Sequence, residues 1–130
     1  CATDAGVDGL TLVNTLPGLL LESATGAAEL GAGAGGISGS ALLPVGLRAV
    51  KRARSETHIP LLGVGGVMAP EDAVAYARAG AALIQLGTAS FATPRAGLLL
   101  TQRLEKWGRR HRVSSWEDLV CSDEDEGSGS

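Results

Sequence analysis

The sequence predicts an α/β fold in which helices connect parallel strands. Two short apolar runs, IPLLGV (59–64) and AALIQLG (81–87), flank a segment with the apolar spacing of a helix. A third run of the same kind, VDGLTLVNT (7–15), precedes them. Nearly continuous apolar runs of this length are typical of strands buried on both faces of a parallel sheet. A strand, a helix and a parallel strand form a βαβ unit, so we expect the strand ends to open on one side of the sheet.

The connection that follows the first predicted strand is unusually long. It runs over residues 16–39, and long connections in compact domains are usually functional or disordered. Its leucines at 19–21 predict a short hairpin arm that covers the mouth of the sheet, whereas GAGAGG (31–36) is flexible by composition.

The next predicted element is a helix over residues 40–56. Leucine, valine and alanine recur along one face of this segment, and Pro44 lies in its early turns, where a missing amide is tolerated. Ser38 or Ser40 is expected to be its N-cap.

Three further helical segments complete the pattern. Pro70 begins a helix between the second and third strands, and Gly80 ends it. After the third strand, residues 94–111 have amphipathic spacing, and a capping box from Ser114 to Glu117 opens a final short helix. We expect five basic residues near the end of the long helix to form a solvated outer face: Arg103, Lys106, Arg109, Arg110 and Arg112.

Glycines follow the second and third predicted strands. Gly65 and Gly66 come after one strand, and Gly87 with Thr88 after the next, so bare amides and a hydroxyl lie at neighbouring carboxyl ends. Such amides can surround a phosphate, and in (β/α)8 barrels a phosphate site is frequently built by the loops after the seventh and eighth strands. The alternative is that the glycines only permit tight turns. Two such pairs at consecutive strand ends favour the phosphate site. GGISG (35–39) is a third glycine-rich entry to a helix.

Chain length bounds this interpretation. A complete (β/α)8 barrel needs about 250 residues, and this chain has 130 and begins with Cys1, so we expect it to be the carboxyl-terminal portion of a barrel. We expect two parts, the barrel portion over 1–121 and a disordered acidic, Gly/Ser-rich tail over 122–130.

Charge and cysteine content exclude several function classes. The net charge is −3, but four acidic residues at 123–126 account for more than this, so the folded part is close to neutral. No charged field indicates nucleic acid or a membrane surface, and no apolar run is long enough for a membrane span. Cys1 and Cys121 match no metal or redox spacing, so we expect reduced thiols, no metal site and a cytoplasmic protein.

Taken together, four motifs resemble the carboxyl-terminal part of dihydroorotate dehydrogenase, an FMN-dependent (β/α)8 barrel of pyrimidine synthesis. They are, in order, TLVNTLPG, GGISGSALLPVGLRAV, IPLLGVGGVMAPEDAVAYARAGA and IQLGTASFATP, and the similarity covers residues 7 to 120. The resemblance implies that the three predicted strands are the sixth, seventh and eighth of the barrel.

The resemblance also implies roles for particular residues. Asn14 and Thr15 would contact the pyrimidine of dihydroorotate or orotate, and Val13 would lie against the flavin. The FMN-binding set is completed by Gly39, Gly65, Gly66, Gly87 and Thr88, the last four of them at the phosphate. An alternative for Asn14 is that it closes an Asx-turn. We expect Ser38 to be a helix cap, and His58 and His111 to be surface residues.

Departures from the family pattern limit what this chain can do alone. The family's catalytic base, a Cys or Ser, belongs to an upstream loop that the chain lacks, so we expect no catalytic residue here and an inactive fragment. Ser40 and Leu43 replace a usual proline and lysine, and the insertion at 24–34 departs from the usual loop. VNTLPG is more similar to the soluble, NAD-linked branch, which implies an iron–sulfur flavoprotein partner subunit and a homo-oligomer. The alternatives are a dihydropyrimidine dehydrogenase-like flavoenzyme and a non-catalytic phosphate-binding half-barrel.

Overall fold

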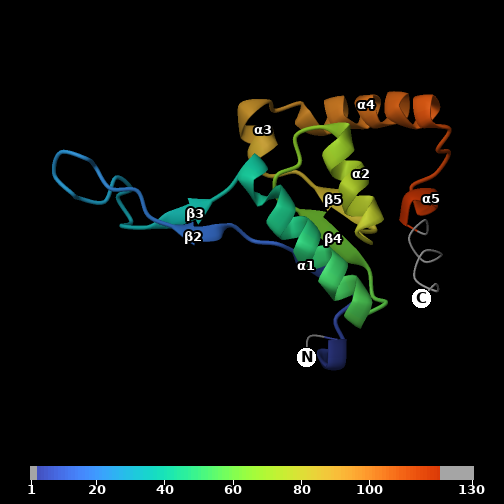
Figure 1. Ribbon diagram of the computed structural model, residues 1–130, viewed down its shortest axis with the longest axis horizontal. Helices are drawn as coiled ribbons and strands as arrows, with labels where there is room; N and C mark the ends of the chain where they lie inside the picture. Colours follow the sequence, from blue (N-terminus) through green and yellow to red (C-terminus); the bar gives the residue numbers. More distant parts are fainter. Residues whose placement is uncertain (1–2, 121–130) are drawn as a thin grey trace, which may run out of the picture.

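A three-stranded parallel sheet forms the centre of the molecule (Figure 1). The structure is a computed structural model that describes residues 3–120. Strands β1 (Leu10–Leu12), β4 (Leu61–Val64) and β5 (Leu83–Gln85) lie in the order β1-β4-β5, with Leu10 beside Leu61 and Leu62 beside Leu83. The three parallel strands predicted from the apolar runs are therefore confirmed, each shorter than its run. Cys1, Cys121 and the predicted tail lie outside the described residues.

Helices follow the strands as the βα pattern predicts. Residues predicted to be helical at 40–56, 70–80 and 94–111 form α1 (Leu43–Glu56), α2 (Pro70–Arg78) and α4 (Ala96–His111), and α1 is preceded by a 3-10 turn, Ser40–Leu42. Three short elements complete the chain: a 3-10 turn at Thr3–Ala5, α3 (Thr88–Ala92) and α5 (Glu117–Val120). Apolar spacing does not predict α3, since a helix of five residues is too short to show periodicity. Among the described residues no helix is long and apolar enough to cross a membrane.

Both predicted serine caps are wrong in detail. Gly39 precedes the 3-10 turn and Leu42 precedes α1, and neither position makes a side-chain cap hydrogen bond. Backbone carbonyls serve as acceptors here instead: the Leu42 amide donates to the Gly39 carbonyl at 3.0 Å, and the Leu43 amide donates to the Ser40 carbonyl. At α5 the reciprocal pair lies one residue later than predicted: the Ser115 amide donates to the Asp118 carboxylate, and the Asp118 amide donates to Ser115 Oγ.

Only one face of the sheet is buried. In β4, Leu61 and Gly63 are buried against the helices, whereas Leu62 is half-buried and its neighbour Leu83 is 60% exposed. Helices α1 and α2 pack on the same side, since Tyr76 of α2 lies against both β4 and α1 (Figure 1). The prediction of strands buried on both faces is therefore wrong for this chain, because its described residues supply helices for one face only.

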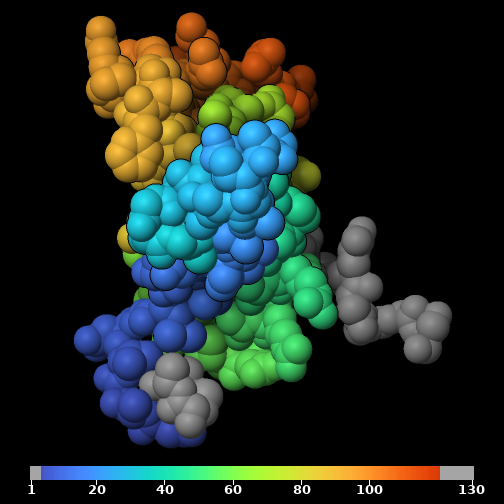
Figure 2. Space-filling view, turned by 90° about the vertical axis from the view of Figure 1, so that its left-hand side faces the viewer, coloured from blue at the N-terminus to red at the C-terminus, as the bar shows by residue number. Residues whose placement is uncertain are grey.

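The long connection forms an arm that points away from the sheet. Strands β2 (Leu16–Gly18) and β3 (Gly35–Ile37) pair antiparallel. Beyond them, backbone hydrogen bonds within the arm involve Leu20, Glu22 and Ala27. Figure 1 shows the arm leaving the body, and Figure 2 views it end-on. The predicted hairpin is thus present, but the expectation that its leucines cover the mouth is wrong. Those leucines, at 19–21, are 57 to 62% exposed.

Candidate functional site

A cavity of about 140 Å³ lies at the carboxyl ends of the three parallel strands. Each strand contributes its last residues or those just after it, and the turn into α1 and the start of α3 complete the wall. All eight residues singled out from the sequence line this one cavity: Val13, Asn14, Thr15, Gly39, Gly65, Gly66, Gly87 and Thr88. Positions separated by up to 75 residues in the chain are therefore brought together, as the parallel topology predicts.

The cavity glycines are of two kinds. Gly66 has φ +77°, and a Cβ there would lie 2.5 Å from the Leu43 backbone nitrogen, so the fold itself requires glycine at this position. Gly87 has φ −108° and a Cβ there would meet no atom within 4 Å. The tight-turn interpretation therefore explains Gly66 sterically but does not explain Gly87. A small residue at 87 leaves room for something outside the protein.

Backbone amides at the strand ends are free to bind a ligand. Within residues 3–120, no acceptor lies within hydrogen-bond reach of the Gly66 and Gly87 amides. Gly66 is buried, and an amide that is removed from water without an acceptor is costly. The hydroxyl of Thr88, partly buried at the first position of α3, adds one more donor on the same wall. These groups fit the requirements of a phosphate.

The cavity carries no ionisable side chain among its lining residues. An anion here would be held by amides and hydroxyls rather than by lysine or arginine. The lining also contains no His, Asp, Glu, Lys, Tyr or Cys, the side chains that most often act in general acid–base catalysis. In residues 3–120, no cluster of three or more His, Cys, Asp or Glu side chains could hold a metal ion.

Asn14 and Thr15 form the wall that belongs to β1. The Thr15 amide donates to the Asn14 side-chain carbonyl at 2.7 Å, and both residues are exposed. This bond joins adjacent residues, so it differs from the predicted Asx-turn, which joins residues two apart. It fixes the side chain of Asn14 and leaves its NH₂ group as a donor. Gly36 of β3 lies against the Thr15 side chain, where a Cβ would collide.

Several residues at the cavity were missed by the sequence analysis. Gln85 ends β5 and Met68 follows the glycine pair, and both line the wall. A polar residue at the end of an apolar run, two positions before Gly87, was the available signal for Gln85. Met68 gave no signal, since a methionine near a strand is usually a core residue. Ser38, expected only as a helix cap, also lines the cavity.

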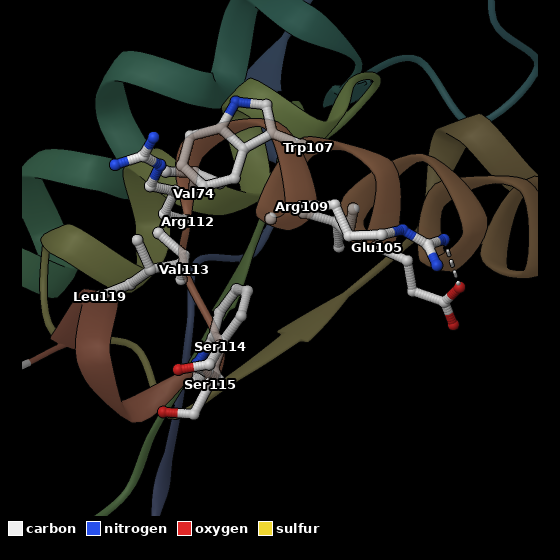
Figure 3. A pocket seen from close by; sticks show the side chains of 12 residues that line it. Val74, Glu105, Trp107, Arg109, Arg112, Val113, Ser114, Ser115 and Leu119 are labelled. Atoms are coloured by element: carbon white, nitrogen blue, oxygen red, sulfur yellow. Dashed lines mark ion pairs between the residues drawn. The ribbon is translucent and has the colours of Figure 1, made fainter.

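A larger hollow of about 600 Å³ lies elsewhere, between α4 and α5 (Figure 3). Trp107 and Trp116 contribute apolar walls and Arg112 lies at its edge, while Arg109 turns toward Glu105 and forms an ion pair at 3.6 Å. None of the residues predicted from the sequence as site residues lines this hollow. The strand-end cavity is therefore the candidate site.

Parallel βα units with a cavity at their carboxyl ends define the class of α/β proteins that bind ligands at this edge of the sheet. The family model for dihydroorotate dehydrogenase matches residues 1–106, which is most of the chain. The chain therefore belongs to the dihydroorotate dehydrogenase family.

Named relatives agree with this assignment. The chain is 42% identical over 120 residues to the catalytic subunit of dihydroorotate dehydrogenase B (NAD+) from Pelobacter propionicus, covering 92% of this chain and 39% of that protein. A relative from Solibacter usitatus, 40% identical over 119 residues with the same coverage, carries a name of the A (fumarate) type. The fold is similar to a crystal structure of the Eimeria tenella enzyme in complex with ferulenol, with a TM-score of 0.73, 22% identity and coverage of 92% of this chain and 32% of that one. The chain thus spans well under half the length of these relatives.

Proposed function

We propose that the protein containing this chain is an FMN-dependent dihydroorotate dehydrogenase, which oxidises dihydroorotate to orotate in pyrimidine biosynthesis. Within it, this segment would bind the FMN phosphate and part of the pyrimidine. The observation that carries the proposal is the single cavity lined by all eight residues that the family resemblance picks out.

Strands β1, β4 and β5 would be the sixth, seventh and eighth strands of a (β/α)8 barrel. They lie in chain order in a parallel sheet with helices on one face, as consecutive barrel strands do. Three strands of eight are about three eighths of a barrel. This fraction agrees with the 39% of the Pelobacter propionicus relative that the chain spans.

The polar groups on the cavity walls indicate which part of FMN or of the pyrimidine each residue would bind. Gly65, Gly66, Gly87 and Thr88 would bind the phosphate through amides and a hydroxyl, and Gly39 and Val13 would lie beside the rest of FMN. FMN, when bound, would supply the hydride acceptor for the oxidation of dihydroorotate. Asn14 and Thr15 would orient the ring through its amide and carbonyl edges. The proton that leaves the ring needs a base, and the family resemblance assigns this role to a Cys or Ser on an upstream loop outside the chain.

The electron acceptor and partners belong to the same proposal. Similarity to the NAD+-type catalytic subunit supports NAD+ as the acceptor and a further electron-transfer subunit as partner. As part of the same proposal, that partner would be an iron–sulfur flavoprotein, and the protein would be a cytoplasmic homo-oligomer. The fumarate-type name of the second relative makes fumarate the acceptor to test beside NAD+.

An anaerobic absorbance spectrum of the full protein that contains this chain tests the proposal. We expect a flavin spectrum that bleaches when dihydroorotate is added, with orotate competing. Bleaching by a dihydropyrimidine without competition by orotate would instead indicate the dihydropyrimidine dehydrogenase-like enzyme. A colourless protein that binds phosphate esters would indicate the non-catalytic phosphate-binding half-barrel. The 130-residue chain alone is expected to be inactive.

A further inference from the structure

We propose that Tyr76 is a positioning residue that orients the Gly65–Gly66 peptide for anion binding. This inference rests on the proposed function, which places the FMN phosphate at these glycines. Tyr76 lies outside the cavity, on α2, and its side chain is fully buried.

The Tyr76 hydroxyl reaches the end of β4 immediately before the glycine pair. Its oxygen lies 2.9 Å from the Gly65 carbonyl oxygen and 3.1 Å from that of Val64. The hydroxyl has one proton, so it donates to one of these carbonyls at a time. Burial raises the pKa of Tyr76, and the nearby charge of Asp72 raises it further, so the hydroxyl keeps its proton at neutral pH.

Because a peptide group is planar, the contact with the Gly65 carbonyl also sets the direction of the Gly66 amide. The Gly65 carbonyl and the Gly66 amide belong to one trans peptide, in which C=O and N–H point in opposite directions. Holding the carbonyl toward Tyr76 therefore turns the Gly66 amide away from α2. This is the buried amide that lacks an acceptor among the described residues.

Two other glycines, Gly46 and Gly63, leave the space that the Tyr76 side chain occupies. A Cβ at Gly46 of α1 would collide with the Tyr76 hydroxyl, and a Cβ at Gly63 of β4 would collide with its ring. Since the phenol fills the space that side chains at 46 and 63 would occupy, the tyrosine and the two glycines form one packing unit. Removing the hydroxyl alone keeps the ring against both glycines, because ring carbons also lie beside the Cβ position of each.

Helix α2 also holds the far side of the same loop. The Asp72 carboxylate accepts hydrogen bonds from the Met68 and Ala69 amides at 2.9 and 2.8 Å. Residues 64–65 and 68–69 are thus both fixed to α2, and Gly66 lies between them. A loop held at both ends keeps its amides oriented before a ligand arrives, which lowers the cost of binding.

The test compares FMN with riboflavin, which has the same ring system and lacks the phosphate, in the full protein that contains this chain. Tyr76→Phe keeps the ring between Gly46 and Gly63 and removes only the hydroxyl. We expect it to weaken FMN binding about fivefold, the effect of one hydrogen bond, and to leave the riboflavin dissociation constant unchanged. Trp116→Phe is the matched control, because it also removes a side-chain donor to a backbone carbonyl, that of Ala81 at 3.1 Å, but away from the cavity. It should change neither constant.

Two results would overturn the inference, and they are distinguishable. If wild-type protein prefers FMN to riboflavin and Tyr76→Phe keeps that preference, or weakens both ligands equally, Tyr76 has no positioning role. If wild-type protein shows no preference for FMN, the phosphate site itself is wrong, and the proposed function fails with it.

Discussion

At the scale of single residues, the glycines of the cavity differ in what a methyl group would meet. At Gly66 it would collide with the Leu43 backbone, whereas at Gly87 the space beside the Cα is open. We expect Gly87→Ala to change the free energy of unfolding by less than about 0.5 kcal/mol, as surface substitutions usually do. It should nevertheless weaken FMN binding, because the methyl group would stand where a phosphate approaches the backbone.

Gly97 provides the control for this prediction. A methyl group on its Cα would also meet no atom within 4 Å, but Gly97 lies on α4 and does not line the cavity. Gly97→Ala should leave FMN affinity unchanged in a fluorescence titration. Equal affinities for wild type, Gly87→Ala and Gly97→Ala would remove Gly87 from the phosphate site.

Residue spacing predicted which positions meet at the cavity but not what holds them there. Six of the eight cavity residues could be found because glycines and polar residues follow apolar runs, a pattern that parallel topology brings to one edge. Val13 and Gly39 were assigned only through the family resemblance. The contact of Tyr76 with Gly46 and Gly63 could not be found, because it joins three elements and depends on side-chain direction. The serine caps were misplaced because a 3-10 turn precedes α1, and its backbone carbonyls rather than serine side chains accept from the Leu42 and Leu43 amides.

At the scale of elements, periodicity predicted the long helices and the strands. It failed for the short helix α3 and for the direction in which the β2–β3 arm leaves the sheet. The five residues of α3 are too few to show a period. Nothing in the leucines at 19–21 distinguishes an arm over the cavity from one that leaves the body.

The short helix α5 gives a prediction about pH. The pKa of Asp118 lies below its ordinary 3.8, because the Ser115 amide and then the Ser114 and Ser115 hydroxyls donate to the carboxylate. A depressed pKa means that the folded state favours the ionised form. Its contribution to stability is therefore complete above pH 3.8 and is lost as the pH falls through the lower, folded-state pKa.

Urea unfolding at pH 5 and pH 3 measures this contribution. Wild type should lose more stability than Asp118→Asn between the two values, since the variant has no carboxyl to protonate. Glu117→Gln is the comparison, because the neighbouring carboxyl makes none of these hydrogen bonds. The prediction fails if Asp118→Asn and Glu117→Gln flatten the pH dependence equally.

At the scale of the whole molecule, the sheet is incomplete within residues 3–120. Neither β1 nor β5 has a strand on its outer edge, and the face opposite the helices exposes Leu83 beside the half-buried Leu62. Open edges and apolar faces favour association with other chains. In a closed barrel the same face points into the interior and is filled by side chains.

Leu83→Lys distinguishes the isolated sheet from the closed barrel, because the substitution should have opposite effects in the two. In the 130-residue chain alone, position 83 is 60% exposed, so lysine should preserve folding and reduce self-association in sedimentation. In the full protein the same lysine would enter the barrel interior, where an unpaired charge costs several kcal/mol. Leu20→Lys, at a leucine of the arm that is 62% exposed, is the matched control and should leave the full protein stable. If the full protein tolerates Leu83→Lys as well as Leu20→Lys, then β1, β4 and β5 do not close into a barrel around this face.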